Sequence, residues 1–575
     1  MKSTNARFLL AAAALSLFIL GTSVASILDS NFGKIEVKSI MISSGEVKLS
    51  AILYRPYSAS SDNPSPAIVI THGISSSKEM MSSIGLELSR RGFVTLCLDL
   101  YGHGKSGGTL EDGEEDPSFG MFSAVQYIKS QPYVNSSKIG MIGHSLGAGA
   151  VRAATVKDGQ IGALVLIAGG LGDSVERLDY GQFNSTFPKN LLVIVGKYDV
   201  LFNITEVTKQ ELPAMFGTQQ EVVPNVTYGN FLSQTARKLV TPSTTHLFEP
   251  FDPAAISEIV TWMQNAFPTT GNSEAAYKVD MIYFEREISF MVGILGLLGI
   301  TLLMFFPISK VAKLKIFEDT PESNSRPKAL KSHAVWGLLN IALFLPLLAV
   351  GFVIPFPPLL FGRSIAWWML GVGLAGLLLI AAKIPKSLTK IGLKETLRET
   401  IGKKEIIAGL TLFLFIFIIA SLLESVFNVN LRIITPIFRA LTDPRRIWAF
   451  LSFLPFFTAY FVAEGLYLHD PYKPKQQQKQ GRPADLHEYF SVVIGKTAPF
   501  LMVICLQYLP AIVFGFWVFP AFFGFIVEFL WLIVPIFIIT TTSSWWFYRK
   551  ARRIGLGALF NTLTMAWVAA AVFPF

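Results

Sequence analysis

After residue 285 the sequence contains eight apolar stretches, each long enough to cross a lipid bilayer. They lie at about 288–307, 334–356, 364–382, 406–424, 447–468, 497–519, 521–543 and 554–573. A spanning helix needs about 20 mostly apolar residues, and a helix that is apolar all round is a buried or membrane helix. Only 15% of the 575 residues are charged, against about 25% in an ordinary soluble chain. The sequence therefore predicts an all-α membrane domain of about eight spans over 285–575.

The charges are divided unevenly along the chain. Residues 1–284 hold 21 Lys and Arg against 25 Asp and Glu, whereas residues 285–575 hold 28 against 15. The extra cations lie in four loops, at 308–333, 383–405, 469–496 and 544–553. With eight spans these loops share one side, which the positive-inside rule makes cytoplasmic. We therefore expect an integral membrane protein with its N-terminal half outside the cytoplasm, at the cell surface or in a lumen, and no nucleic-acid partner.

One loop does not fit this topology. Residues 425–446 should lie outside, yet Asp443 is the only acid there, against four arginines: Arg432, Arg439, Arg445 and Arg446. We expect this loop either to lie along the membrane surface as an interfacial segment or to mark a miscounted span.

The N-terminus has the form of a targeting segment. Lys2 and Arg7 precede an uncharged run from Phe8 to Leu28. Small residues at Ser23-Val24-Ala25 fit a signal peptidase site, but the run is also long enough to span a bilayer uncut. Residues 1–28 are thus a signal peptide or a signal anchor, and either sends the next residues across the membrane. Four Asn-X-Ser/Thr motifs, all between 30 and 280, agree with an external glycoprotein: Asn135, Asn184, Asn203 and Asn225.

Residues 30–280 have the pattern of an α/β domain. Apolar runs typical of buried parallel strands are Val47–Tyr54, Ala67–Thr71, Thr95–Asp99, Lys138–Ile142, Ala163–Ala168, Leu191–Val195 and Ala236–Val240. Segments with helical spacing are Met80–Arg91, Met121–Ser130, Leu146–Val156 and Pro253–Asn265. This alternation predicts a doubly wound, mostly parallel sheet.

The strongest chemical signal is Gly143-His144-Ser145-Leu146-Gly147, which follows a predicted strand and opens a predicted helix. A nucleophile on such a sharp turn needs small residues two before and two after it. The sequence therefore predicts Ser145 as a nucleophile.

A serine needs a base, and the base needs a carboxylate to fix its tautomer. Of seven histidines, the others lie in the membrane half, in glycine turns or beside Ser145, which leaves His246 as the base. Asp199 follows a predicted strand between the two and is the expected acid, while Asp173 and Asp179 are weaker alternatives. For the oxyanion we expect two backbone donors, the amides of Leu146 and Ile74.

These motifs together resemble the α/β-hydrolase superfamily. They are Thr71-His72-Gly73, Asp99 to Ser106, Gly143 to Gly147, Gly196-Lys197-Tyr198-Asp199 and His246. The set is similar to the branch of serine esterases, monoacylglycerol-lipase-like, serine-aminopeptidase-like and dienelactone-hydrolase-like proteins. In that family the turn at Asp99 is structural, and a segment between the late strands covers the site, for which 200–235 is the candidate. Dienelactone hydrolases carry a cysteine where this chain has Ser145.

We therefore expect a membrane-bound serine hydrolase that cleaves a small or lipid-like carboxylic ester through an acyl-enzyme, without cofactor or metal. A peptidase or amidase with the same triad is one alternative. A transporter or sensor with a regulatory, hydrolase-like outer domain is another, because eight spans exceed what tethering needs. Glu464 and Glu528 are candidate functional groups of the membrane half, since ionisable residues inside spans are costly, and Glu528 is expected nearer mid-span.

Overall fold

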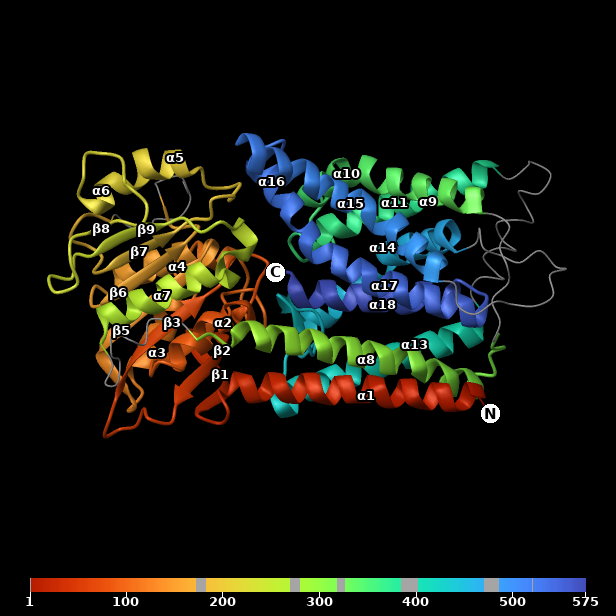
Figure 1. The fold of residues 1–575 in the computed structure, drawn as a ribbon, viewed down its shortest axis with the longest axis horizontal. Helices are drawn as coiled ribbons and strands as arrows, with labels where there is room; N and C mark the ends of the chain where they lie inside the picture. Colours follow the sequence, from red (N-terminus) through yellow and green to blue (C-terminus); the bar gives the residue numbers. More distant parts are fainter. Residues whose placement is uncertain are drawn as a thin grey trace.

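The computed structural model describes residues 2–171, 183–268, 280–317, 326–383, 402–469, 486–519 and 521–575. An α/β half and a helical half lie end to end along the long axis of the molecule (Figure 1). The weaker acid candidates Asp173 and Asp179 lie outside the described residues.

The α/β half is built on one nine-stranded sheet with the order β1-β2-β4-β3-β5-β6-β7-β9-β8. Its strands are β1 (Ile35–Ser44), β2 (Val47–Pro56), β3 (Ser65–Thr71), β4 (Val94–Leu98), β5 (Val134–His144), β6 (Ala163–Ile167), β7 (Leu191–Ile194), β8 (Thr227–Tyr228) and β9 (Arg237–Val240). The strands from β4 through β9 in this order pair in parallel, whereas β1, β2 and β8 pair antiparallel. The predicted doubly wound, mostly parallel sheet is confirmed.

The sequence did not reveal β1 and β8. β1 is half exposed along its length, so its residues form no continuous apolar run, and β8 has only two residues. Both flank the sheet, where exposure weakens the hydrophobic signal on which strand prediction depends.

Helices cover both faces of the sheet. α3 (Met121–Lys129) and α4 (Leu146–Lys157) pack on one face, and α2 (Lys78–Ser89) and α7 (Pro253–Ala266) pack on the other. α7 begins as its sequence indicates, with Pro253 at the first turn and the Asp252 carboxylate accepting the amides of Ala254 and Ala255. The sheet is therefore buried on both sides, and its strand ends remain available for a site.

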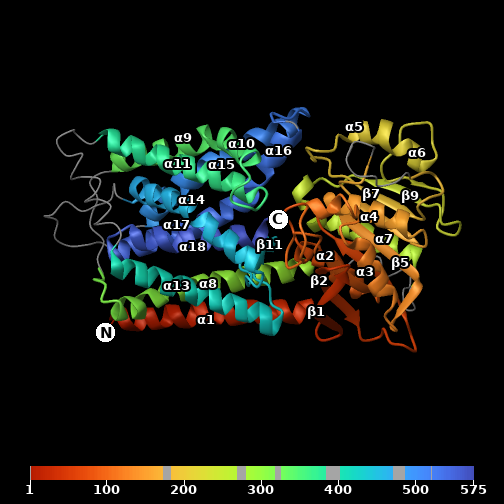
Figure 2. The same cartoon turned by 180° about the vertical axis from the view of Figure 1, so that it is seen from behind.

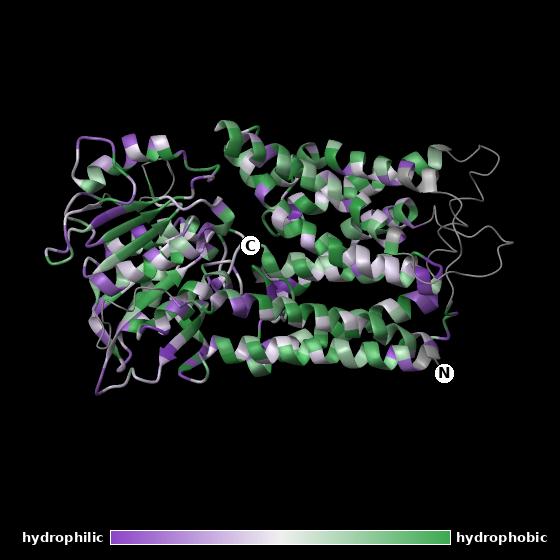
Figure 3. Cartoon of the chain, viewed as in Figure 1, coloured by the Kyte–Doolittle hydropathy of each residue, from purple (hydrophilic) through white to green (hydrophobic). Residues whose placement is uncertain are grey.

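The helical half consists of long apolar helices (Figure 3). They are α8 (Tyr283–Val311), α9 (Arg326–Ala342), α10 (Phe344–Val353), α11 (Gly362–Lys383), α13 (Lys403–Phe427), α14 (Pro444–Leu468), α15 (Leu486–Phe514), α16 (Ala521–Glu528), α17 (Leu530–Ala551) and α18 (Gly555–Val572). Among the described residues, eight helices including α1 (Lys2–Asp29) are long and apolar enough to cross a membrane, and the pair α9–α10, bent by 42°, makes a ninth if it is one span. The predicted helical membrane region after 285 is confirmed.

Phe575 and the N-terminus lie at opposite ends of the helical bundle. The C-terminal Phe575 exchanges backbone hydrogen bonds with the α/β half, accepting the Leu110 amide at 3.0 Å and donating to Gly102 at 3.2 Å. The N-terminus lies at the opposite end of the bundle in both views (Figures 1 and 2). An even number of crossings after residue 283 returns the chain to the α/β side, in agreement with eight spans.

The arginine-rich loop 425–446 lies between the two halves. It carries the short strands β10 (Arg432–Ile433) and β11 (Thr435–Pro436). The buried Arg439 guanidinium donates to Glu79 of α2, and Arg432 forms two hydrogen bonds with Glu287 of α8. The other two arginines bond differently, since Arg445 pairs with Asp443 of the loop itself and Arg446 donates to backbone carbonyls. The structure thus gives an explanation that neither expectation for this loop contained, because two of its cations pair with buried acids.

The N-terminal helix α1 packs closely along α8. A Cβ on Gly21 would clash with the backbone of Gly293, and one on Gly296 would clash with the backbone of Phe18. Glycines thus allow the two backbones to touch, as small residues do between membrane helices. At the end next to the α/β half, Asp29 accepts a hydrogen bond from Arg286 of α8 at 2.6 Å.

We predict that α1 is retained as a signal anchor. Ala25, which would end a signal peptide, is fully buried inside the continuous helix α1. Cleavage there would remove residues 1–25 and expose the glycine face of α8 against which they pack. Intact-mass measurement of the purified protein should give the uncleaved chain, and a mature N-terminus at Ser26 would contradict the prediction.

We also predict that Arg439→Met destabilises the whole chain. Breaking a buried ion pair from one side leaves an uncompensated charge, here Glu79, at a cost of about 3–5 kcal/mol. Thermal unfolding followed by tryptophan fluorescence should show a clear fall in Tm. Arg445→Met in the same loop, at a side chain that is 41% exposed, is the matched control and should cause a smaller fall. Equal falls would show that the Arg439 pair has no special role.

Candidate active site

Ser145 stands on a sharp turn between β5 and α4. Its φ of 52° and ψ of −118° are strained for a residue other than glycine. A Cβ on Gly143 would clash with the carbonyl oxygen of Gly147, so this turn closes only with a glycine at position 143. The local sequence therefore holds the Ser145 side chain at the carboxyl end of the sheet.

Ser145, His246 and Asp199 form one chain of hydrogen bonds. Nε2 of His246 lies 3.0 Å from the Ser145 Oγ, and Nδ1 of His246 lies 2.8 Å from Oδ2 of Asp199. Burial by itself lowers the pKa of His246, but the Asp199 charge and hydrogen bond outweigh it and raise that pKa above the ordinary 6.5. The three residues that the sequence singles out are thus brought together in the geometry that activates a serine.

The Asp199 carboxylate is held in place by its own loop. Asp199 follows β7 after a short turn, and its Oδ1 accepts the amides of Leu201 at 2.7 Å and Phe202 at 3.2 Å. Its other oxygen is left for His246. This division of acceptors orients the carboxylate toward the imidazole.

The two expected oxyanion donors lie next to Ser145 in different ways. Leu146 directly follows Ser145 as the first residue of α4, where a helix leaves its amides without helical partners. Ile74 borders the same cavity as Ser145. A Cβ on Gly73 would lie 2.9 Å from the Cβ of Ser145. Glycine at this position therefore lets the loop after β3 approach the serine closely.

Sequence reasoning missed a buried carboxyl behind the histidine. Glu249 is fully buried, and its Oε1 accepts the amide of Gly196, which precedes Asp199 in the same loop. Burial, with the Asp199 charge added, raises the pKa of Glu249 well above its usual value, which favours its neutral form. Glu249 therefore ties the His246 turn to the Asp199 loop, which no short sequence motif indicates.

Helices of the membrane half form one wall of the site. The Phe525 ring meets the His246 ring edge-on with centroids 5.5 Å apart. Glu528 accepts the Leu247 amide at 3.2 Å and the Tyr508 hydroxyl at 2.6 Å. The sequence placed Glu528 near the middle of a span, but α16 ends there and turns it toward His246. The site is completed by residues about 280 positions from the histidine in sequence.

The segment 200–235, expected as a small insertion over the site, contributes two contacts. The Phe202 ring stacks on His246 at 6.1 Å, and Val200 packs into the core of the helical half. The segment otherwise forms the short helices α5 (Ile204–Glu206) and α6 (Leu212–Phe216), with a π-helical turn between them. Its first residues therefore join the site to the membrane half.

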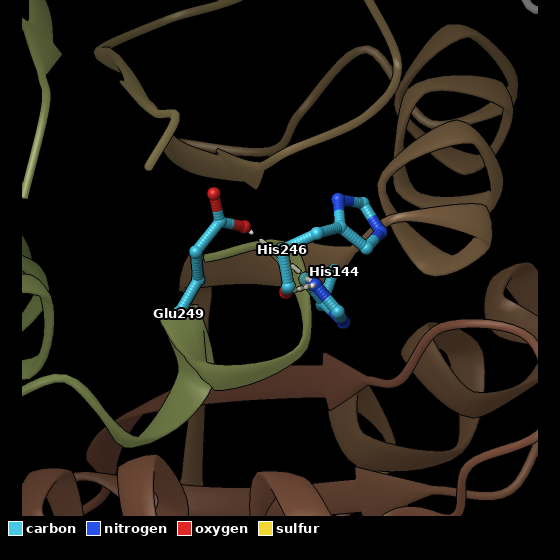
Figure 4. Close-up of side chains that lie close together, drawn as sticks. All are labelled: His144, His246 and Glu249. Carbon is cyan, nitrogen blue, oxygen red and sulfur yellow. Dashed lines mark hydrogen bonds and ion pairs between the residues drawn. The ribbon is translucent and has the colours of Figure 1, made fainter. Parts of the chain in front are cut away.

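His144, His246 and Glu249 are close enough to offer three ligand atoms to a metal ion, all within 4.8 Å. The interactions drawn in Figure 4 run from His144 to the backbone oxygen of His246 and to Glu249. Both ring nitrogens of His246 are engaged by Ser145 and Asp199. A metal bound to this ring would break the hydrogen-bond chain, so the donor set fits a hydrolytic triad better than a metal site.

Part of the α/β half is similar in sequence to known proteins. Residues 62–234 match the family model described as serine aminopeptidase, S33. The uncharacterized protein YcjY of Escherichia coli strain K12 is 30% identical over 125 residues, which are 20% of this chain and 40% of that protein. The match thus spans less than half the length of that relative.

Solved structures similar to this chain include two α/β proteins with named activities. A dienelactone hydrolase of Anabaena variabilis is 24% identical, with 40% of this chain and 94% of that chain covered and a TM-score of 0.27. An esterase of Pyrococcus furiosus is 19% identical, with 41% and 94% covered and a TM-score of 0.31.

We predict that Glu249→Gln leaves hydrolysis and its pH profile nearly unchanged, whereas Glu249→Ala impairs both folding and turnover. Glutamine keeps a neutral acceptor for the Gly196 amide, and alanine leaves that buried amide unpaired at a cost of about 1–3 kcal/mol. The measurements are Tm and the rate against pH with a chromogenic ester.

The acid limb of the pH profile reports His246, which acts as a base only when neutral. Because its pKa is raised, the rate should fall as the pH drops through a midpoint above 6.5. A downward shift of that midpoint in Glu249→Gln would mean that Glu249 is ionised and would contradict the prediction that it is neutral.

Proposed function

Because residues 62–234 form an α/β-hydrolase domain, we propose that this chain is a membrane-bound serine hydrolase that cleaves carboxylic esters. The observation that carries the proposal is the continuous hydrogen-bond chain from Asp199 through His246 to Ser145. The cavity above it is bordered mainly by apolar side chains, with Ser145 at its wall. A serine nucleophile beside an apolar cavity suits an ester with a hydrocarbon part.

In the proposed reaction Ser145 Oγ attacks the ester carbonyl carbon while His246 Nε2 takes the hydroxyl proton. The Leu146 and Ile74 amides stabilise the oxyanion. As the C–O bond breaks, His246 returns the proton to the departing alcohol and leaves an acyl group on Ser145. Water then attacks the acyl carbonyl, His246 takes its proton, and the acid departs as Ser145 regains a proton. Asp199 stabilises the imidazolium in both halves.

The proposal places the domain outside the cytoplasm. α8 and α17 start near the α/β half and end at the opposite end of the bundle (Figure 1). Their last turns carry Lys310, Arg549 and Lys550, which agrees with the positive-inside rule for an outer site. The loop 425–446 is then a smaller exception, because buried ion pairs explain Arg432 and Arg439 on the outer side.

Peptide hydrolysis is a second candidate, since the matched family model is described as serine aminopeptidase. Glu528 borders the cavity and is an acid of the kind that could pair with a substrate amine. Aminoacyl amides of a fluorescent amine, assayed beside esters, separate the two reactions, because only the peptidase releases the amine.

We predict that the purified full chain is labelled by a fluorophosphonate probe and that Ser145→Ala abolishes both labelling and ester turnover. The probe reports an activated serine, and the variant removes only its hydroxyl. Ser136→Ala, at an exposed position of the same strand β5, is the matched control and should stay labelled. Undiminished labelling of Ser145→Ala would refute the proposed nucleophile.

A further inference from the structure

Three cavities run from Ser145 into the helical half. The first is bordered by Ser145 and His246 on one side and by Phe525, Phe529 and Leu532 on the other. Ligand pockets are typically lined by apolar side chains with a few polar groups that fix orientation, and this cavity has that make-up. The cavity thus continues beyond the serine toward α16 and α17.

The second and third cavities lie next to the first and to each other. The second shares Phe529 and Leu532 with the first. The third shares Phe529, Ile533 and Phe573 with the second. Each cavity therefore has side chains in common with the next.

The walls change character with distance from the serine. The first cavity still includes the carboxyl of Glu528 and the hydroxyls of Ser75 and Ser76. Every residue that borders the second is apolar, and Ser364 is the one polar residue bordering the third. Apolar cavities of this kind remain dry and accept apolar ligands.

The third cavity lies close to an exposed apolar face of the bundle. It is bordered by Phe352 of α10, which is 37% exposed and whose ring lies 5.4 Å from that of Phe522 in α16. Phe522 and Phe523 are also exposed. Exposed phenylalanines on helices of spanning length suit contact with hydrocarbon chains, so the row of cavities extends from the serine toward a face that lipid would cover.

We propose that these cavities hold the acyl chain of the substrate, which is an ester of a long-chain fatty acid. The inference rests on the proposed hydrolase function and names its substrate class. The ester carbonyl lies at Ser145, the first methylenes pass Phe529 and Leu532, and the rest of the chain lies among α11, α17 and α18. The acyl-enzyme keeps its chain in the helices while the alcohol leaves on the α/β side.

The test uses the full chain and p-nitrophenyl esters of butyric, octanoic and palmitic acid, which share one leaving group. Leu532→Trp fills the junction of the first two cavities, and Ala569→Phe fills the second, farther from the serine. Leu532→Trp should lower the octanoate-to-butyrate ratio of kcat/KM by about tenfold or more, since a pocket discriminates by roughly that factor per poorly fitting group. Ala569→Phe should lower the palmitate-to-butyrate ratio more than the octanoate-to-butyrate ratio.

Ile538→Trp is the matched control, because Ile538 lies on α17 with Leu532 but is 39% exposed and borders none of the three cavities. Its ratios should equal those of the wild type. A short fluorophosphonate confirms that Ser145 is reactive in each variant, so misfolded variants are recognised. Unchanged ratios in both cavity variants would overturn the acyl cavity, whereas no ester turnover by the wild type would reject the hydrolase itself.

Discussion

An α/β domain can bury the carboxyl edge of its sheet against a helical bundle only if every charge at that boundary finds a partner. Isolated buried ions are too costly to tolerate. Here Arg439 of the 425–446 loop pairs with Glu79, and Lys78 beside it pairs with Asp99 at the end of β4. Where α1 ends and α8 begins, Arg286 pairs with both Asp29 of α1 and Glu287 of α8. These ion pairs help to hold the two halves in one relative orientation.

This orientation of the two halves completes the site. With the halves docked in this way, Phe525 and Glu528 reach His246 and Leu247, and the cavity at Ser145 has a wall that the α/β half does not provide. The many spans then have a reason beyond anchoring, because the helices that border Ser145 also border the apolar cavities. A transporter with a merely regulatory outer domain does not require such an arrangement.

Most strands and helices and the turn at Ser145 could be predicted from the sequence, because each depends on residues close together in the chain. His246 and Asp199 were chosen instead by excluding the other histidines and by their order along the chain. What the sequence could not supply was contact between distant segments. Glu528 looks like a mid-span acid until α16 is seen to end beside the imidazole. The cations of 425–446 look like a violation of topology until Glu79 and Glu287 are seen opposite them. Glu249 has no motif, since its partner amide at Gly196 lies in another loop.

The central claim is that the acyl chain of the substrate runs from Ser145 into the membrane helices. The most direct measurement is photocrosslinking with a long-chain fluorophosphonate that carries a diazirine at the end of its alkyl tail. After the phosphonate reacts with Ser145, irradiation and peptide mapping should locate the tail on α11, α17 or α18. Crosslinks confined to the 200–235 segment or to the surface of the α/β half would contradict the account.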